Sequence, residues 1–550
     1  MRSLFCCLIV SAVVFSARAA EEVRTLALDE FRDKMKGAWV GQLAGVTYGM
    51  PTEFKFTEPG AKLMPETLVP NWKDEMINTA FDQDDLYVDL TFLASLDRHG
   101  VDVTSRQAGI DFANTTYFLW AANREGRINL RKGIAPPDCG HPDFSTRTDD
   151  IDYQIEADYS GIVAPGLPQA AVDFGRTFGR LVCYGDGLYA GQFVGAMYAE
   201  AYFTTNVREI VVRALKAIPS ESQYAEMVRD MLAWHEAHPD DPVRVRGLAV
   251  DKYLLDRNYQ RRSNGAIDCK INGAMILLGL LWGGGDFEKT VVLSMRGGFD
   301  SDCNPSSAAG ILGAACGLSR LPPKFGRLLR NDTVFLSTPY DVPGVYAASE
   351  RVARAVVKRY GGDVVATTDG EAFRIPVRET VPDACHPSWA AEPCAKSRYT
   401  AEEMSRQKYA IGPSDRFFEG WTVADCMPKY LTNWKHLDYA WETVPASRSD
   451  DVVLTHETRL PVGDPRLVID VGTEDKDMFR LVVRVNGEVL FETVERTVWG
   501  WNSKLTLSLA KWAGKDVKIE LVTSPCTMGT GRAYWHELAV RGVMAADAAE

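Results

Sequence analysis

The stretch that decides the fold is Arg296-Gly297-Gly298-Phe299-Asp300-Ser301-Asp302-Cys303-Asn304-Pro305. It places two carboxylates in a glycine-rich turn. Asn304 as a cap and Pro305 as the first helical residue predict that a small-residue helix follows, over Ser306 to Cys316. Unpaired carboxylates in so apolar a stretch are costly to desolvate. The turn therefore predicts that its two acids meet a partner from elsewhere in the chain.

A second acidic pair lies earlier, in Phe81-Asp82-Gln83-Asp84-Asp85-Leu86, at the start of an apolar stripe with helical spacing. Acids near a helix N-terminus are favourable by about 0.3–1 kcal/mol each, so this position alone would explain either pair. Four carboxylates with few nearby bases instead favour a hard cation, Mg²⁺, Mn²⁺ or Ca²⁺. No histidine-rich spacing indicates catalytic zinc.

The hydrophobic period divides the chain into two folded parts. Apolar residues recur at helical spacing from about residue 28 to 360, and short β-rich runs follow after about 410, with a hairpin turn at Asn486-Gly487. We expect a multidomain protein, with an all-α domain followed by an all-β sandwich. The expected boundaries are a helical catalytic domain over 24–365, an extended, surface-lying connection over 366–409, and the β-sandwich over 410–543.

Tryptophans are concentrated in the β-rich part, where seven of the thirteen follow residue 420. Trp499 and Trp501 alternate, which would place both on one face of a strand. The region resembles the galactose-binding-like jelly rolls of secreted carbohydrate-active enzymes, and this resemblance implies glycan binding. Packing of the tryptophans in the sandwich core is the alternative.

The N-terminus predicts export. Arg2, an apolar run from Leu4 to Phe15, and Ala17-Arg18-Ala19 are typical of a cleaved signal peptide over residues 1–19. No later segment has the length of about 20 apolar residues that spans a bilayer. We therefore expect a mature protein without a membrane span, in the periplasm or outside the cell.

Charge and cysteine content exclude some functions and leave others open. The formal net charge of −13, without a basic cluster, argues against nucleic acid as a partner. The cysteines show no CxxC spacing, although a single bridge between Cys385 and Cys394 is compatible with an oxidising compartment. Neither feature indicates an oligomeric state.

Ordered motifs across about residues 30 to 330 resemble the ADP-ribosylglycohydrolase family. Its C-terminal signature is matched by Asn272-Gly273-Ala274, Leu280 to Phe287, Gly298 to Cys303, and Ala309 to Ala314. Its opening is matched by Gly37 to Gly41, Gly45, and Gly49-Met50-Pro51-Thr52-Glu53-Phe54. The family's Thr-Asp-Asp-Thr corresponds to Gln83-Asp84-Asp85-Leu86, and its His-Gly-Asp segment to Cys183-Tyr184-Gly185-Asp186.

The resemblance implies an all-α orthogonal bundle that binds one or two Mg²⁺ ions and hydrolyses bonds at the anomeric carbon of ribose. The catalytic residues that it implies are Glu53, Asp84 and Asp302. The metal ligands that it implies are Gln83, Asp84, Asp85, Asp300, Asp302 and Cys303. We add as candidate substrate-binding residues Glu156, Asp158, Tyr184, Asp186 and Gly298. Glu53 as an exposed helix-end acid, and Glu156 with Asp158 in a solvated loop, are the alternatives.

Several positions depart from the family's pattern. Gln83 and Cys303 replace hydroxyl-bearing ligands, and Leu86 and Val46 replace a threonine and an aspartate. A thiol is a poor ligand for Mg²⁺, so we expect water at the Cys303 position and leave the second ion open. Tyr184 in place of the family's histidine predicts a changed substrate pocket.

Three functions fit these observations. The first is a metal-dependent glycoside hydrolase acting on a pentose-like glycoside or glycan. The second is removal of ADP-ribose from an acceptor, against which export argues. The third is a non-catalytic glycan-binding protein, against which the four retained carboxylates argue.

Overall fold

The structure is a computed structural model, which describes residues 22–543 except 257–258, 264, 409–417, 419, 425, 427, 433–438, 448, 475–476, 496–502 and 527–528. The predicted signal peptide lies outside the described residues, as do Trp499 and Trp501. Within the described part of the chain, no helix combines the length and the apolar character that crossing a bilayer requires.

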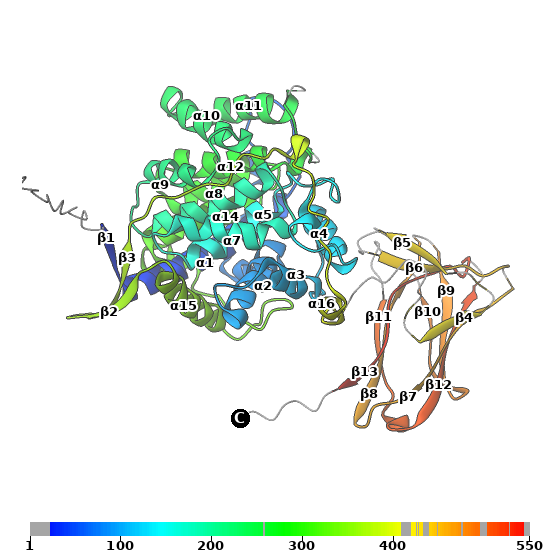
Figure 1. Ribbon diagram of the computed structural model, residues 1–550. Coiled ribbons are helices and arrows are strands. Elements are labelled where there is room, and N and C mark those ends of the chain that lie inside the picture. The colour runs from blue at the N-terminus through cyan, green and yellow to red at the C-terminus, as the bar shows by residue number, and fades with distance from the viewer. Residues whose placement is uncertain are drawn as a thin grey trace, which may run out of the picture.

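The first part of the chain forms the predicted helical domain (Figure 1). Helices α8, α12 and α14 are buried along nearly their whole length, so they form its centre. The helices are α1 (Leu28–Gly49), α2 (Asp84–His99), α3 (Ser105–Ala113), α4 (Ala121–Arg131), α5 (Asp152–Ile155), α6 (Asp158–Ile162), α7 (Pro168–Thr177), α8 (Asp186–Ala201), α9 (Val207–Ala214), α10 (Gln223–Ala237), α11 (Pro242–Val250), α12 (Cys269–Gly283), α13 (Phe287–Arg296), α14 (Cys303–Cys316), α15 (Val342–Arg359) and α16 (Ala401–Ser405).

The helices α1 and α14 pack backbone to backbone at the centre of this domain. Gly37, Gly41, Gly45 and Gly49 recur every four residues and therefore lie on one face of α1. A Cβ added at any of the four would overlap the backbone of α14 or of the residues that flank it. At Gly49 the overlap would be with the backbone of Ser301 and Asp302. The glycine face therefore fixes where the acidic turn lies.

The sequence did not predict a small antiparallel sheet on the helical domain. Its strand order is β1-β3-β2, with β1 (Val23–Ala27), β2 (Asp363–Thr367) and β3 (Gly370–Pro376). Leu26 pairs with Phe373, and both side chains are buried in the core of the helical domain. The first part of the predicted connection, residues 366–376, therefore continues the helical domain.

The rest of that predicted connection is also tied to the helical domain. Gln192 Nε2 donates to Asp383 at 2.7 Å, and the Tyr189 hydroxyl donates to the Ala384 carbonyl at 2.9 Å. Further along, the Tyr399 amide donates to the Gly133 carbonyl at 2.9 Å. We propose on this basis that the helical domain extends to about residue 408, the last described residue before the sandwich.

The last part of the chain is a β-sandwich with its own core. Two five-stranded antiparallel sheets have the orders β10-β9-β12-β7-β4 and β11-β8-β13-β6-β5. Asn486 and Gly487 form the predicted turn between β9 and β10, with φ of 52° and 79°. The strands are β4 (Trp421–Ala424), β5 (Lys429–Thr432), β6 (Tyr439–Thr443), β7 (Val452–Arg459), β8 (Asp464–Gly472), β9 (Phe479–Val485), β10 (Glu488–Glu495), β11 (Ser503–Ser508), β12 (Asp516–Pro525) and β13 (Ala533–Val543).

Tryptophans fill the sandwich core. Trp421, Trp441, Trp512 and Trp535 are all buried there, so packing accounts for these four. The Trp535 indole donates to Thr443 Oγ1 at 2.9 Å, which satisfies its one polar group.

The disulfide left open by the sequence is not formed, because Cys385 and Cys394 carry free thiols.

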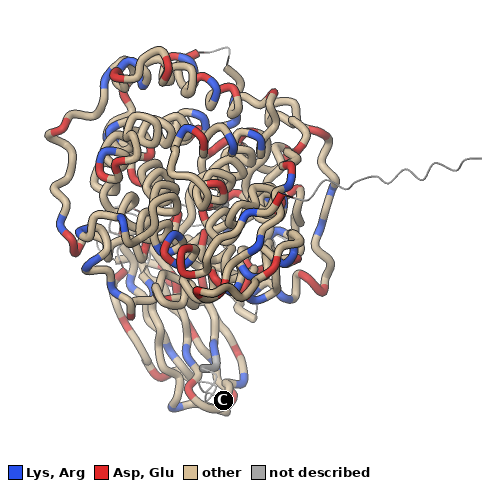
Figure 2. The backbone as a smooth tube through the Cα atoms, turned by 90° about the vertical axis from the view of Figure 1, so that its left-hand side faces the viewer, with Lys and Arg blue, Asp and Glu red and all other residues tan. Residues whose placement is uncertain are grey.

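Acidic residues lie in the outer loops and also in the helices inside the helical domain (Figure 2), where many Asp and Glu side chains are buried.

We expect Gly45→Ala to lower the free energy of unfolding of the helical domain by about 3 kcal/mol, because the added methyl group overlaps the backbone of Pro305. Denaturant unfolding followed by helical circular dichroism measures this loss. Gly326→Ala is the control, because its methyl group meets only side-chain carbons, of Val40 at 3.3 Å and of Leu318 at 4.0 Å. Equal stability of the two variants would contradict the packing argument.

Candidate metal centre and its surroundings

Both acidic pairs lie at helix N-termini, as predicted. Asp84 and Asp85 are the first two residues of α2, and Gln83 occupies its N-cap position. Asp300 and Asp302 directly precede α14. The free amides and the dipoles of both helices therefore favour negative charge at these positions.

The start of α14 differs from the prediction. The helix begins at Cys303 with Asp302 at the N-cap position, two residues before Pro305. Asn304, the predicted cap, instead donates through Nδ2 to Asn272 Oδ1 at 2.9 Å. A tertiary hydrogen bond therefore replaces the local capping bond that the sequence suggested.

The turn before α14 is strained at Phe299, which has φ of 63°. This conformation costs about 1–3 kcal/mol for a bulky residue. It is matched by Phe54, with φ of 51°, whose amide donates to the Phe299 carbonyl at 2.9 Å. The Phe299 amide donates to the Phe56 carbonyl at 3.0 Å. Since Phe54 follows Glu53, these bonds bring the Glu53 segment to the acidic turn.

Two further positions shape this turn. Gly298 has φ of 83°, and a Cβ there would overlap the Phe56 carbonyl oxygen. This contact explains the glycine without a role in substrate binding. Arg246 is fully buried, donates to the Gly297 carbonyl at 3.1 Å, and lies 4.8 Å from the ring centre of Phe56. No local motif in the sequence marks Arg246, so its role in the turn could not be predicted.

The two acidic pairs converge on one thiol. Ligand atoms of Asp84, Asp85 and Cys303 lie within 4.8 Å of one another, and so do those of Asp300, Asp302 and Cys303. Side chains from two distant segments therefore meet at the N-termini of α2 and α14.

Several of these carboxylate oxygens are buried without a hydrogen-bond partner from the described protein. They are both oxygens of Asp85, Oδ2 of Asp300 and Oδ1 of Asp302. Burial and the charge of Asp302 raise the pKa of Asp84 to about 6. Burial, with the charge of a neighbouring carboxylate, raises the pKa values of Asp85 and Asp300 well above their usual range. Each ionised group therefore makes ionisation of the others costlier.

Glu53 lies at the solvent-exposed rim of this cluster. Partial desolvation and the negative charges of Asp302 and Asp84 raise its pKa to about 8. The neighbouring charges separate Glu53 from an ordinary exposed acid. In the cation-free protein its carboxyl group holds a proton at neutral pH.

A divalent cation fits this donor set. Buried like charges without counter-charge are strongly destabilising, and carboxylate oxygens are the preferred ligands of hard cations. The unpartnered oxygens of Asp85, Asp300 and Asp302 are available for such an ion. The described residues thus supply both the charge and the free donor atoms that a cation requires.

Glu156 and Asp158 are fully buried, which rules out the solvated-loop alternative. Asn123 Nδ2 donates to Glu156 Oε1, while Glu156 Oε2 has no partner among the described residues. Burial raises the pKa of Glu156 well above its usual range, and the charges of Asp152 and, to a smaller extent, Asp84 raise it further. Asp158 accepts from the Tyr198 hydroxyl at 2.7 Å and is held by the protein itself. Glu156 is therefore the better candidate to face a ligand.

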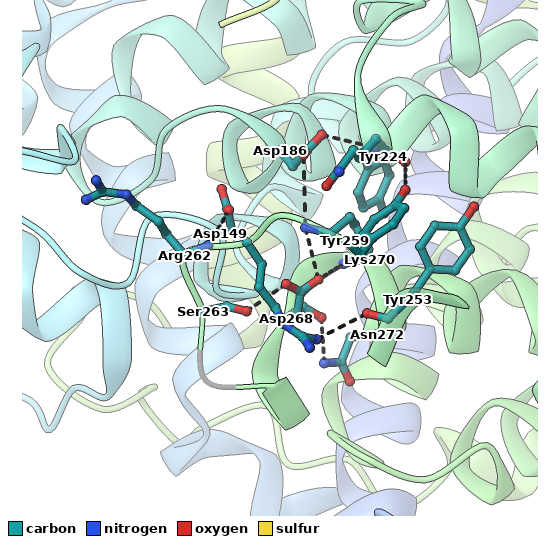
Figure 3. A network of polar contacts seen from close by, with 12 residues as sticks. Asp149, Asp186, Tyr224, Tyr253, Tyr259, Arg262, Ser263, Asp268, Lys270 and Asn272 are labelled. Atoms are coloured by element: carbon teal, nitrogen blue, oxygen red, sulfur yellow. Dashed lines mark hydrogen bonds and ion pairs between the residues drawn. The ribbon is translucent and has the colours of Figure 1, made fainter. Parts of the chain in front are cut away.

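Asp186 belongs to a different polar network, which Figure 3 shows. Lys270 is fully buried and lies 3.2 Å from Asp268 and 4.0 Å from Asp186. Burial alone would lower the pKa of Lys270, but Asp268, Asp186 and Asp149 raise it well above its usual value. Asp186 also accepts from the Tyr224 amide at 2.9 Å. These contacts make Asp186 part of a buried ion network.

Tyr184 lies under the segment that the sequence assigned to the interdomain connection. Its hydroxyl accepts from the Glu392 amide at 3.3 Å, and its ring packs edge-on against His141 at 5.1 Å between centres. Ser388 in the same segment donates to Asp149 and to the Tyr184 carbonyl. The structure therefore places Tyr184 with the Lys270 network and not with the acidic pairs.

Asn272, which Figure 3 shows beside Asp268, also contacts the acidic turn. Its Nδ2 donates to the Asp268 carbonyl at 3.0 Å, and its Oδ1 accepts from the Asp300 amide at 3.1 Å. The sequence analysis used Asn272 only as part of a motif. Its place in an otherwise apolar helix was the signal that could have identified it.

The family model described as ADP-ribosylglycohydrolase matches residues 27–361, which include every residue of the acidic cluster. The chain belongs to the ADP-ribosylglycohydrolase family. This membership supports a glycohydrolase-like function for the helical domain. None of the curated proteins compared matches the sequence significantly.

Solved structures show similarity to both domains. An ADP-ribosylglycohydrolase-related protein complex is 17% identical, covering 60% of this chain and 99% of that chain, with a TM-score of 0.36. TmCBM61 in complex with beta-1,4-galactotriose is 19% identical, covering 22% of this chain and 89% of that chain, with a TM-score of 0.18. CBM35 from Paenibacillus barcinonensis is 14% identical, covering 23% and 94%, with a TM-score of 0.18. Because these scores are low, the architecture described above rests on the helices and the strand order.

We expect Asn272→Ala to weaken divalent-cation binding by about 10- to 100-fold, because the Asp300 amide and Asn304 lose their shared acceptor. Titration calorimetry with Mn²⁺ measures the affinity. Asn78→Ala is the control, because Asn78 donates at the surface to the Leu328 carbonyl. An unchanged affinity in Asn272→Ala would show that Asn272 does not position the turn.

In the cation-free protein, we expect the free energy of unfolding to fall as the pH rises from about 4 to about 8. The folded-state pKa is about 6 for Asp84, about 7 for Asp152 and about 8 for Asp158, all above the unfolded value of 3.8. The folded state therefore holds protons that the unfolded state has released. The stability from these protonated groups is complete below the unfolded pKa and is lost as the pH rises through the folded values.

Denaturant unfolding across this pH range, in EDTA and in excess Mg²⁺ or Mn²⁺, measures the effect. A bound cation should flatten the profile because it stabilises the ionised carboxylates. A profile in EDTA that rises over this range would contradict the assignment.

Proposed function

We propose that the protein is an exported, metal-dependent glycoside hydrolase that cleaves a bond at the anomeric carbon of a pentose-like sugar in a glycoside or glycan. The observation that carries this proposal is the convergence of four acids, with unpartnered buried oxygens, beside the raised-pKa carboxyl of Glu53. Such a set of groups suits a reaction in which positive charge develops at a sugar carbon.

Asp84, Asp85, Asp300 and Asp302 would hold one or two cations, for which Mg²⁺ is the family's ion and Mn²⁺ or Ca²⁺ are alternatives. When bound, such an ion polarises oxygen atoms of a substrate or of water. The carboxylates orient the ion, and the helix N-termini that carry them fix the carboxylates. Gln83, at the N-cap position of α2, would add a neutral ligand through its side-chain amide oxygen.

Glu53 would exchange a proton with the leaving group or the attacking water. A general acid or base is most efficient when its pKa lies near the working pH, and the pKa of about 8 meets that condition. Its exposed position at the rim leaves it accessible to a substrate. Glu156, with its unpartnered oxygen, is our candidate for holding a sugar hydroxyl.

Removal of ADP-ribose from an acceptor is the second candidate, because the family name itself describes that chemistry. The predicted signal peptide argues against it, since ADP-ribose derives from a cytoplasmic cofactor. A non-catalytic glycan-binding protein is the third candidate. Against it stand the clustered buried acids, which would only destabilise a site without function.

A substrate panel tests the proposal. The mature protein is incubated with Mg²⁺ or with EDTA and with aryl furanosides, aryl pyranosides and ADP-ribosylated protein. We expect cation-dependent release from a furanoside. Release from ADP-ribosylated protein alone would favour the second candidate, and glycan binding without turnover of any substrate would favour the third.

We expect Asp302→Ala to abolish hydrolysis and to leave glycan binding by the β-sandwich intact. The substitution removes a negative charge from the cation's ligands, while the sandwich has its own core. Kinetics and affinity electrophoresis on the same variant separate the two effects.

Asp286→Ala is the matched control, because Asp286 caps α13 as an exposed residue and its loss costs only about 1 kcal/mol. Wild-type turnover in Asp302→Ala would exclude the metal mechanism. Joint loss of turnover and glycan binding would mean that the two domains form one site.

A further inference from the structure

Cys303 is the common member of the two groups of candidate metal ligands. Its Sγ lies within 4.8 Å of carboxylate oxygens of Asp84 and Asp85, and also of Asp300 and Asp302. The side chain is 4% exposed, so this thiol is enclosed by the acids and not by solvent. A cation bound by either acidic pair therefore lies beside a sulfur atom.

The neighbouring hydroxyl group does not offer an alternative to this sulfur. Ser301 lies between the two acids of the turn, but its Oγ is 2.9 Å from Thr52 Oγ1. Thr52 in turn donates to the Gly49 carbonyl at 2.7 Å. Ser301 is thus engaged with the end of α1, whereas Cys303 Sγ belongs to both groups of candidate ligands.

A second sulfur lies beside the other end of the cluster. Gln83 Nε2 is 3.5 Å from Met50 Sδ, so the amide nitrogen of Gln83 is directed toward a thioether. The side-chain amide oxygen of Gln83 is then the atom that remains to bind a cation. Gln83 would thus add an oxygen ligand, and Cys303 is the soft donor beside the four acids.

We propose that Cys303 Sγ is a metal ligand shared by the two acidic groups, and that it selects a borderline transition-metal ion such as Co²⁺ or Zn²⁺ over Mg²⁺. Mg²⁺ binds oxygen almost exclusively and keeps much of its water, whereas the transition-metal ions accept mixed oxygen and sulfur ligands. On binding, the thiol proton leaves to solvent and the thiolate coordinates the ion. This inference rests on the proposed cation site and names the class of ion that the site takes.

The alternative is that Cys303 only packs, as a small apolar residue at the start of a helix. The chain provides a matched comparison in Cys316, the last residue of the same helix. Cys316 is partly buried and belongs to neither candidate ligand group. A ligand role should distinguish the two cysteines, whereas a packing role should not.

The test is a Co²⁺ titration of the cation-free full-length mature chain, followed by near-ultraviolet absorption. A thiolate bound to Co²⁺ gives a sulfur-to-metal charge-transfer band that oxygen ligands do not give. Cys303→Ser, Cys303→Thr and Cys316→Ser are titrated alongside the wild type, and Mn²⁺, Zn²⁺ and Mg²⁺ compete for the site. Circular dichroism confirms that each variant is folded.

We expect the band in the wild type and in Cys316→Ser, and its loss in Cys303→Ser and Cys303→Thr. We also expect affinity for Co²⁺ and Zn²⁺ to fall by about 10- to 100-fold in both Cys303 variants, with affinity for Mg²⁺ retained or increased. The difference between wild type and Cys303→Ser removes any contribution from the other thiols.

Failure to bind Co²⁺, binding without the band, or a band that survives in Cys303→Ser would each overturn the inference. If both Cys303 variants fail to fold, the wild-type spectrum decides the question by itself. Absence of the band excludes a thiolate ligand. One equivalent of band, with the affinity at which the acidic cluster binds Co²⁺, supports one. Turnover is not measured in this test. If the band is present but the substrate panel shows no glycoside hydrolysis, the proposed function is wrong and the metal assignment still holds.

Discussion

The site depends on the backbone contact between α1 and α14. Side chains larger than hydrogen at Gly45 or Gly49 would push α14 away from α1, because there is no space for a Cβ atom. Protein interiors are close-packed, so such a shift cannot be absorbed by empty space. Gly49 meets the backbone of Ser301 and Asp302, so the packing of two helices also places a candidate metal ligand.

The close packing of the helices brings buried acids together, and these acids repel one another when they are ionised. Asp85, Asp300 and Asp302 are buried within one cluster, and each raises the cost of ionising its neighbours. Around Lys270 the repulsion among buried acids is reduced by an internal cation, since Asp268, Asp186 and Asp149 surround one buried ammonium group. The described residues place no such ammonium group in the acidic cluster. One domain thus contains an acid network with an internal counter-charge and an acid cluster that has none among the described residues.

Local signals predicted the acids and tertiary contacts decided the rest. The sequence predicts that a helix begins beside each acidic pair, because in both places carboxylates precede apolar residues at helical spacing. The exact start of α14 does not follow from these local signals. The helix begins at Cys303, two residues before the predicted start, because Asn304 bonds to Asn272 and does not cap the helix. The β1-β3-β2 sheet was missed for the same reason, since its outer partner β1 comes from the other end of the domain. The matched motif around Tyr184 gave no warning that residues 388–392 cover it.

Among the candidate metal ligands, the departures from the family's pattern fall on residues other than the four acids, and this has a physical consequence. Asp84, Asp85, Asp300 and Asp302 all remain, while Gln83 and Cys303 differ from the hydroxyl-bearing residues that the family resemblance implies. The total charge of a site determines whether a cation binds at all, because only a cation compensates buried carboxylates. The ligands at the two other positions set the softness of the donor set and so influence which cation is preferred. Bound as a thiolate, Cys303 would also add one negative charge to the four acids. Substitutions at Gln83 and Cys303 therefore leave the four acids in place and, in our proposal, change which cation the site selects.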